Sequence, residues 1–170
     1  MPVGESSRDG QSNGVQPDLR FNLSHTRGAA LIGVAAGREL GIDIEWQRPM
    51  EDLEGMARAV MSREELGQWL VLPPDDQTPA FYHLWTRKEA YLKAIGLGLY
   101  RSLQDVTVPV SARQLDPHSG RGGLVRDSAG SGIWAIADIA AGDGYSASIC
   151  CEGASVPALT VEDLTPAAIG

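Results

Sequence analysis

The chain has little of what several protein classes require. Its only two cysteines, Cys150 and Cys151, are adjacent, so they offer no disulfide framework and favour a reducing compartment. Residues 1–9 contain no apolar core of a signal peptide, and no apolar run is long enough to cross a bilayer. We therefore expect a cytoplasmic protein.

Histidine and positive charge are also scarce. Three histidines and no Cys-x-x-Cys pair argue against a zinc site, and the sequence shows no sign of a hydrolase elbow or a serine triad. The net charge of −8 argues against general nucleic-acid binding, which needs a basic face. A phosphate ligand is still compatible with this charge, because a metal ion and a few local cations can dominate one cleft.

Length and composition fit a single domain. The chain has 170 residues, and its apolar fraction of 43% is ordinary for a globular protein that buries a core. We expect a flexible N-terminal segment at 1–19, one domain at 20–152 and a loose tail at 153–170. The expected fold class is α+β, with a small antiparallel sheet packed against one long helix.

Local patterns predict the elements of this domain. Ser62 and Glu65 fit a capping box, and Thr78 with Pro79 predicts the start of the long helix. Two apolar runs on either side of a Gly-Arg-Glu turn predict a hairpin over 29–45. The expected helices are 51–60, 62–72 and 79–95, and the expected strands are 19–23, 29–36, 40–45, 106–110, 124–125, 133–139 and 145–151.

Two acids share one side of the predicted strand 40–45. Because side chains alternate along a strand, Ile42 and Ile44 point to one side while Asp43 and Glu45 point to the other. Two carboxylates on one side repel each other unless a cation or solvent relieves them. Hard carboxylate oxygens suit Mg²⁺, and the sequence does not distinguish Mg²⁺ from Mn²⁺. The alternative is a solvated strand face without a ligand.

The predicted helix 79–95 carries three charged residues on or beside its apolar stripe. Lys88 falls near the middle of the stripe, where its ammonium must reach water or find an anion. Glu89 and Lys93 lie one turn apart at the edge, which is compatible with a phosphate site or with a plain surface salt bridge. The stripe consists of Phe81, Leu84, Trp85, Leu92 and Ile95.

Ser24 and His25 are expected where a strand turns back. A hydroxyl, an imidazole and backbone amides at such a turn can bind a phosphate. The alternative is a turn that Ser and Thr side chains stabilise without any ligand.

Three motifs in this order, at 21–26, 41–45 and 85–98, resemble the 4′-phosphopantetheinyl transferases, and their spacing is similar to the Sfp type. They read Phe-Asn-Leu-Ser-His-Thr, Gly-Ile-Asp-Ile-Glu and Trp-Thr-Arg-Lys-Glu-Ala-Tyr-Leu-Lys-Ala-Ile-Gly-Leu-Gly. The resemblance covers residues 17 to about 150. It implies a 4′-phosphopantetheinyl transferase half-fold, and transfer of the phosphopantetheine arm of coenzyme A to a serine of an acyl or peptidyl carrier protein, with release of adenosine 3′,5′-bisphosphate.

The resemblance also implies roles for individual residues. It implies that Asp43, Glu45 and Glu89 hold Mg²⁺ against the coenzyme A pyrophosphate, which Lys93 also contacts. Ser24 and His25 would contact the 3′-phosphate, and Lys88 would lie near the incoming hydroxyl. Glu65 matches an acid sometimes proposed as the general base, a task that Glu89 or a metal-bound water could perform instead.

One departure from the Sfp type concerns the first half of the fold. Sfp-type chains usually have two similar halves, whereas here the second-half motif follows directly on a polar segment, and residues 9–12 stand where a Gly-Lys-Pro motif is expected. Loss of a half should expose an apolar face, so a homo-oligomer is expected. Docking of an acidic carrier would need a local basic or apolar patch, for which the sequence offers Arg20, Arg27, Arg63, Arg87 and Arg101.

Three functions are therefore in competition. The first is an active transferase, because all the metal and lysine positions are filled. The second is a non-catalytic or degenerate half-enzyme that binds a carrier protein or a complementing subunit. The third is another metal-dependent phosphoryl enzyme, such as a small phosphatase, that uses the same carboxylates.

Overall fold

The computed structural model describes residues 18–96, 101–111, 113, 115, 123–128, 130 and 132–163. The predicted N-terminal segment up to residue 17, with the expected motif position at 9–12, and the end of the tail at 164–170 lie outside the described residues. No helix within the described ranges is long and apolar enough to cross a membrane.

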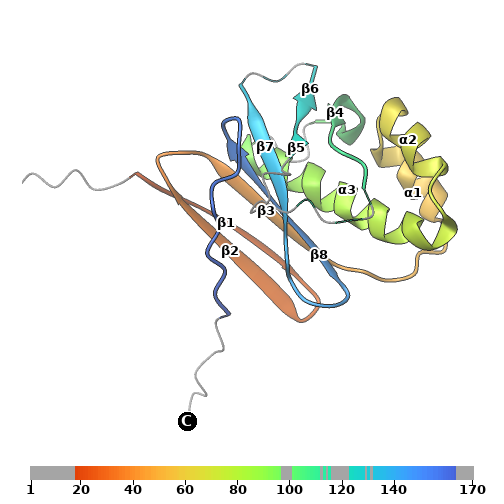
Figure 1. Ribbon diagram of the computed structural model, residues 1–170, viewed down its shortest axis with the longest axis horizontal. Coiled ribbons are helices and arrows are strands. Elements are labelled where there is room, and N and C mark those ends of the chain that lie inside the picture. Colours follow the sequence, from red (N-terminus) through yellow and green to blue (C-terminus); the bar gives the residue numbers. More distant parts are fainter. Residues whose placement is uncertain are drawn as a thin grey trace, which may run out of the picture.

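The elements form an α+β fold, which confirms the predicted class. A four-stranded antiparallel sheet has the order β3-β8-β7-β5, and two smaller pairs are β1-β2 and β4-β6. Figure 1 shows α1 and α2 gathered near one end of the long helix α3. The elements are β1 Leu19–Thr26, β2 Ala29–Ala36, β3 Leu40–Trp46, α1 Leu53–Val60, α2 Arg63–Leu70, α3 Pro74–Ala94, η2 Leu103–Asp105, β4 Val106–Thr107, β5 Gly123–Leu124, β6 Arg126–Asp127, β7 Trp134–Ile139 and β8 Tyr145–Glu152.

Strand β3 lies between two layers. A Cβ atom added to Gly41 would come within 2.1 Å of the Ala90 carbonyl oxygen, so the backbone of β3 touches α3 directly on this side. A Cβ atom added to Gly33 of β2 would come within 3.0 Å of Ile42, so the β1-β2 hairpin covers the opposite side. The residues of β3 that alternate with Ile42 therefore face α3.

The predicted hairpin over 29–45 is wrong. Strand β2 pairs with β1, and β3 pairs with β8. Instead of a backbone ladder between β1 and β3, alternate side chains of β1 accept hydrogen bonds from the backbone N–H groups of β3. The donor–acceptor distances are 3.1 Å for Ile42 to Asn22, 3.3 Å for Ile44 to Ser24 and 3.2 Å for Trp46 to Thr26. These side chains satisfy amides that would otherwise be unpaired at the sheet edge.

The long helix begins earlier than predicted. Its first residue is Pro74, with Pro73 as the N-cap, and Pro79 lies inside the helix. Pro79 is the sixth residue of the helix and has no N–H, so the carbonyl oxygen of Asp75 lacks its usual intrahelical donor and the first turns lose one hydrogen bond. The capping box at Ser62 is confirmed, because Ser62 accepts from Glu65 N and the Glu65 side chain accepts from Ser62 N.

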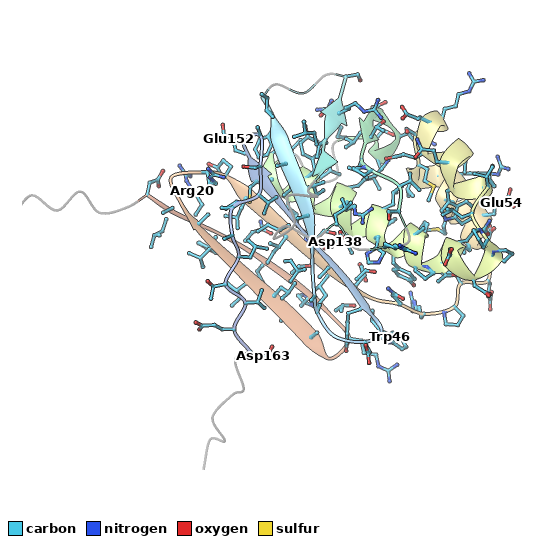
Figure 2. All side chains as sticks on the ribbon, viewed as in Figure 1. Arg20, Trp46, Glu54, Asp138, Glu152 and Asp163 are labelled. Carbon is cyan, nitrogen blue, oxygen red and sulfur yellow. The ribbon has the colours of Figure 1, made fainter. Side chains whose placement is uncertain are left out.

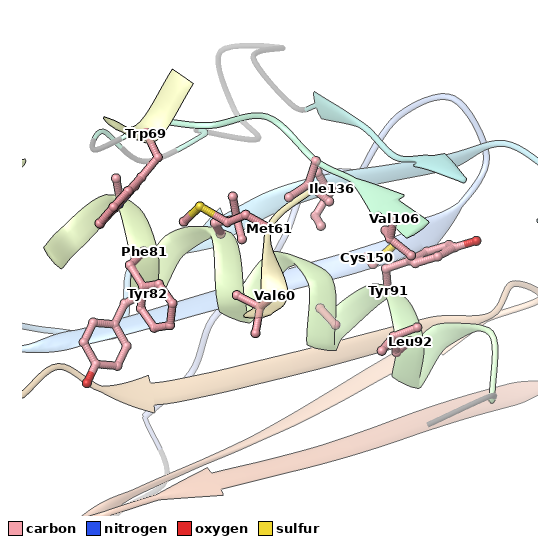
Figure 3. Packing of buried hydrophobic residues seen from close by; sticks show 14 of the residues in the cluster. Val60, Met61, Trp69, Phe81, Tyr82, Tyr91, Leu92, Val106, Ile136 and Cys150 are labelled. Carbon is pink, nitrogen blue, oxygen red and sulfur yellow. The ribbon is translucent and has the colours of Figure 1, made fainter. Parts of the chain in front are cut away.

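Two apolar cores flank the sheet. The larger core packs α3 against α1, α2 and the sheet, and Figure 3 shows Phe81, Tyr91 and Leu92 of α3 within it. The smaller core lies on the opposite face, around Ile42 and Ile44 of β3. Residues 153–163 form no helix or strand, yet Val156 and Leu159 of this segment pack against the smaller core.

Candidate functional site

The centre of the candidate site is the carboxylate of Asp43. It projects from β3 toward α3, and only 5% of the residue is exposed. Its Oδ1 atom accepts hydrogen bonds from Lys93 Nζ at 2.7 Å and from Ser24 Oγ at 2.9 Å. Lys93 Nζ also donates to Ser24 Oγ at 2.9 Å. The helix lysine therefore pairs with the strand acid, and one serine of β1 joins both.

Glu45 and Glu89 surround this pair as further acids. Burial raises the pKa of Glu45, and the neighbouring charge of Asp43 raises it further, against a hydrogen bond from Thr26 and the charge of Lys93. Burial likewise raises the pKa of Glu89, and the charges of Asp43 and Glu45 add to this. Three carboxylates from β3 and α3 thus repel one another within a partly desolvated space.

The donor set suits a hard divalent cation. The second oxygen of Asp43, Oδ2, is buried and has no hydrogen-bond partner among the described residues. A buried carboxylate oxygen without a partner is costly, and a cation would relieve both this cost and the repulsion among the acids. The part of the chain that the structure describes contains no three acid, histidine or cysteine side chains already placed as metal ligands. Convergence of Asp43, Glu45 and Glu89 on one ion therefore stays a prediction.

Ser24 and His25 lie within β1, whereas a turn was expected there. Because neighbouring strand residues point to opposite sides, Ser24 faces Asp43 and is buried, while His25 lies on the exposed side of the hairpin. The structure brings Ser24 into the acid site but does not bring His25 to it. The predicted contact of both residues with one phosphate stays a prediction.

Lys88 and Glu65 form a separate buried ion pair. Lys88 Nζ lies 2.5 Å from Glu65 Oε2, and neither residue is exposed. The lysine also donates to the carbonyl oxygens of Val60 at 2.9 Å and Leu103 at 2.7 Å. Burial lowers the pKa of Lys88, and the charge of Glu65 opposes this. The anion that the apolar stripe required is therefore Glu65.

Glu65 uses both carboxylate oxygens in this arrangement. Oε2 accepts from Ser62 N, and Oε1 accepts from Val108 N, both at 2.7 Å. None of the hydrogen bonds described for Lys88 or Glu65 involves the Asp43–Lys93 pair. The structure therefore shows that Lys88 and Glu65 link α2, α3 and the segment after β4. The catalytic roles predicted for these two residues stay predictions.

A second buried ion pair was missed from the sequence. Arg87 donates to both carboxylate oxygens of Asp138, and both side chains are fully buried. Arg87, which was expected to be available for docking a partner, is therefore not exposed. Asp138 also accepts from Ser148 Oγ, which lies 2.9 Å from Thr86 Oγ1. The available signal was one carboxylate within the apolar strand run 133–139, which implies a buried cationic partner.

Comparisons with known proteins agree with this architecture. The sequence model of the 4′-phosphopantetheinyl transferase superfamily matches residues 39–150. The chain is 39% identical to 4′-phosphopantetheinyl transferase HetI of Nostoc sp. over 57% of this chain and 40% of HetI. It is 38% identical to Sfp of Bacillus subtilis over 61% and 47% of the respective chains. It is 36% identical to AcpT of Salmonella typhimurium over 68% of this chain and 62% of AcpT.

A solved structure shares the fold. It is a holo-(acyl-carrier-protein) synthase from Bacillus anthracis in complex with CoA (3′,5′-ADP). The TM-score is 0.54 at 20% identity, over 67% of this chain and 94% of that chain. The chain thus corresponds to nearly all of this synthase but spans less than half of HetI and Sfp.

Proposed function

From the premise that this chain belongs to the 4′-phosphopantetheinyl transferase superfamily, we propose that it transfers the phosphopantetheine arm of coenzyme A to a serine of an acyl or peptidyl carrier protein, in a reaction that depends on Mg²⁺. The observation that carries this proposal is the clustering of mutually repelling carboxylates around Asp43, with the Lys93 ammonium beside them. A metal-bound pyrophosphate needs acids for the ion and a cation for the phosphate oxygens.

In this reaction the carrier serine forms a bond to the phosphorus atom next to the pantetheine arm, and adenosine 3′,5′-bisphosphate leaves as the P–O bond to it breaks. Asp43, Glu45 and Glu89 would hold the divalent ion, which supplies charge neutralisation at the pyrophosphate. Lys93 would exchange its contact with Asp43 for a phosphate oxygen. The serine proton needs an acceptor, and the half-buried Glu89 is more accessible for this than Glu65, whose two oxygens are engaged.

Incubation with coenzyme A, Mg²⁺ and an apo carrier protein tests the proposal. We expect the carrier to gain the mass of one phosphopantetheine group at its serine, and EDTA to abolish the gain. Restoration by excess Mg²⁺ or Mn²⁺ after EDTA would identify the ions that the acids accept. A carrier that stays in the apo form under all these conditions, in parallel with an active control enzyme, would contradict the proposal.

The second candidate is a non-catalytic or degenerate half-enzyme that binds a carrier or a complementing subunit. It is favoured by the exposed apolar side of the β1-β2 hairpin, where Phe21 is 78% exposed and Ile32 is 64% exposed, because a complementing subunit would cover such a face. Calorimetry distinguishes the two candidates. Carrier binding without any binding of coenzyme A would select the half-enzyme, whereas binding of both ligands favours the transferase.

We also propose that the chain forms a homo-oligomer. The outer face of the β1-β2 hairpin supports this. Here Phe21 is paired directly with Val34, and Leu23 with Ile32. Phe21 is 78% exposed and Ile32 is 64% exposed, so one side of both strands presents apolar groups to solvent. An exposed apolar surface of this kind is typical of an interface. His25 lies at one end of this face, so a second copy seated on it would also cover His25.

We expect the Phe21→Glu variant to dissociate into monomers, because the interface would have to bury an unpaired charge. Light scattering of wild type and variant at equal concentration measures this. Val71→Glu is the matched control, since Val71 is 81% exposed beyond the end of α2 and far in sequence from the hairpin. A wild-type chain that is monomeric at working concentration would contradict the expected oligomer.

A further inference from the structure

Three side chains of β1 hold the edge of β3, and two of them also contact acids of the candidate site. Asn22, Ser24 and Thr26 accept, in this order, from the backbone N–H groups of positions 42, 44 and 46, so the two strands run in the same direction. Figure 2 shows Arg20, before the first of these contacts, and Trp46, at the last, at opposite ends of the two strands. The hydrogen bond described for Asn22 involves no acid, whereas Ser24 and Thr26 each bond one.

The hydroxyl of Ser24 has all its hydrogen-bonding capacity in use. Its oxygen accepts from Ile44 N at 3.3 Å and from Lys93 Nζ at 2.9 Å. A serine hydroxyl has two lone pairs and one proton, so the proton remains for the third neighbour, Asp43 Oδ1, at 2.9 Å. The amide and the ammonium can only donate, and an ionised carboxylate can only accept, so the partners alone fix the direction of each bond. Ser24 is therefore a committed donor to Asp43.

This contact determines which oxygen of Asp43 is left for a ligand. Oδ1 accepts from both Ser24 and Lys93, whereas Oδ2 is buried and has no hydrogen-bond partner among the described residues. In the proposed reaction Lys93 moves to a phosphate oxygen, and Ser24 then remains as the donor that holds Oδ1. The orientation of the carboxylate, with Oδ2 left for a cation, therefore depends on Ser24.

Thr26 has the corresponding contact with the second acid of β3. Its hydroxyl oxygen accepts from Trp46 N at 3.2 Å, and its proton is donated to Glu45 Oε2 at 3.4 Å. This second bond is longer than the one from Ser24 to Asp43, so it orients its carboxylate less strongly. Two hydroxyls of one strand thus each restrain one carboxylate of the next strand.

We propose that Ser24 and Thr26 are positioning residues for the divalent ion, whose hydroxyls orient the carboxylates of Asp43 and Glu45 so that both acids bind the ion with little loss of side-chain freedom. This inference rests on the proposed function, since it takes the ion of that reaction as the ligand. It also gives Ser24 a role that differs from the predicted contact with the 3′-phosphate of coenzyme A. Ser24 is only 6% exposed, and its one proton is already donated, so it has none left for a phosphate.

Ser24→Ala tests the first hydroxyl. We expect the affinity for Mn²⁺ to fall roughly tenfold or more, because loss of a group that orients a metal ligand typically has an effect of this size. Titration with Mn²⁺, followed by the electron paramagnetic resonance signal of the free ion, measures the affinity without any transfer reaction. The binding that is lost in Asp43→Asn defines the acid site.

Asn22→Ala is the matched control for Ser24→Ala. It removes the same kind of bond from a β1 side chain to the backbone of β3, but no contact with an acid. We expect it to leave the affinity for Mn²⁺ unchanged, and melting temperatures verify that both variants are folded. An equal loss of affinity in the two variants, or no loss in Ser24→Ala, would overturn the proposal. A wild-type chain without Mn²⁺ binding that depends on Asp43 would overturn it as well.

Thr26→Val and Thr26→Ser separate the second hydroxyl from packing. Valine keeps the shape of the side chain and removes the hydroxyl, whereas serine keeps the hydroxyl and removes a methyl group. We expect the valine variant to bind Mn²⁺ more weakly than wild type, by a smaller factor than Ser24→Ala, and the serine variant to bind it normally. Equal losses in the two variants would assign Thr26 to packing and overturn its role as a positioning residue.

A comparison of coenzyme A with 3′-dephospho-coenzyme A tests the alternative role of Ser24. As a positioning residue, Ser24 can be replaced by alanine without a change in the ratio of the two affinities, while the affinity for Mn²⁺ falls. A loss of the preference for coenzyme A, together with normal Mn²⁺ binding, would overturn the proposal and assign Ser24 to the 3′-phosphate.

These measurements separate the positioning role from the reaction, because Mn²⁺ binding is read directly. If the acids bind Mn²⁺ and Ser24→Ala weakens this binding, the positioning role stands even where no carrier is modified and the proposed function fails. If the carrier is modified but Ser24→Ala binds Mn²⁺ as well as wild type does, the reverse holds.

Discussion

Replacement of Glu89 by glutamine is expected to abolish most of the transfer activity and, in the same protein, to raise the stability of the metal-free fold. Loss of one group that stabilises the transition state typically lowers kcat by roughly 100-fold to 1,000-fold. Glu89 is proposed both as a metal ligand and as a proton acceptor, so we expect an effect at the upper end of that range. The mass-shift rate with saturating Mg²⁺ measures it.

The gain in stability follows from the raised pKa of Glu89, whose causes are burial first and then the charges of Asp43 and Glu45. In the unfolded chain this carboxyl ionises near its ordinary pKa of 4.5, so above its higher folded pKa the folded protein holds a carboxylate that is disfavoured there. Glutamine removes this cost. The stabilisation should be fully present above the folded pKa and should disappear as the pH falls toward 4.5.

Thermal unfolding in EDTA at neutral pH and near pH 4.5 tests this expectation, and addition of Mg²⁺ should stabilise the wild type more than the variant. Gln104→Glu serves as a control for an unrelated change of the same size, since the side-chain hydrogen bond described for Gln104 goes to the exposed carbonyl oxygen of Arg58 and not to the acid site. A variant that is less stable than wild type in EDTA would show that Glu89 is not strained by its neighbours. Normal transfer by the variant would remove Glu89 from the site.

Local patterns in the sequence predicted the parts of the fold that depend on neighbouring residues. The alternation predicted that Ile42 and Ile44 lie on one side of the strand and Asp43 on the other, and both isoleucines are in the smaller core as expected. That the side of Asp43 is buried against α3 rather than open could not be predicted from the strand alone. The capping box at Ser62 is likewise complete within four residues. Lys88, within the apolar stripe of α3, was expected to need an anion, and Glu65 is that anion.

Features that depend on residues far apart in the sequence could not be predicted from such local patterns. Strand β2 pairs with β1 rather than with β3, and β1 also bonds the edge of β3 through its polar side chains. Pro74 and Pro79 both fit the start of a helix, and the helix begins at the first of them. The partner of Arg87 lies 51 residues away, beyond any local pattern.

The pair of Lys88 and Glu65 provides the other large expected effect. Removal of one partner of a buried ion pair costs about 3–5 kcal/mol, because the other charge stays buried without compensation. We therefore expect Lys88→Met to lose stability in this range, measured by urea unfolding. The double variant Lys88→Met/Glu65→Gln should recover only part of the loss. It leaves no uncompensated charge, but the glutamine amide has one acceptor oxygen where the carboxylate accepts from both Ser62 N and Val108 N.

The same variants decide whether Glu65 is the general base. Transfer is measured well below the melting temperature of each variant, so that all are folded. If the pair only links the helices, the double variant should keep a kcat within about threefold of wild type, because a folded site retains the acids at Asp43 and Glu89. If Glu65 accepts the serine proton, kcat should stay lower by roughly 100-fold or more although the variant is folded at the assay temperature. The geometry favours the first outcome: both oxygens of Glu65 are bound, to Ser62 N and Lys88 on one side and to Val108 N on the other, and the side chain is fully buried.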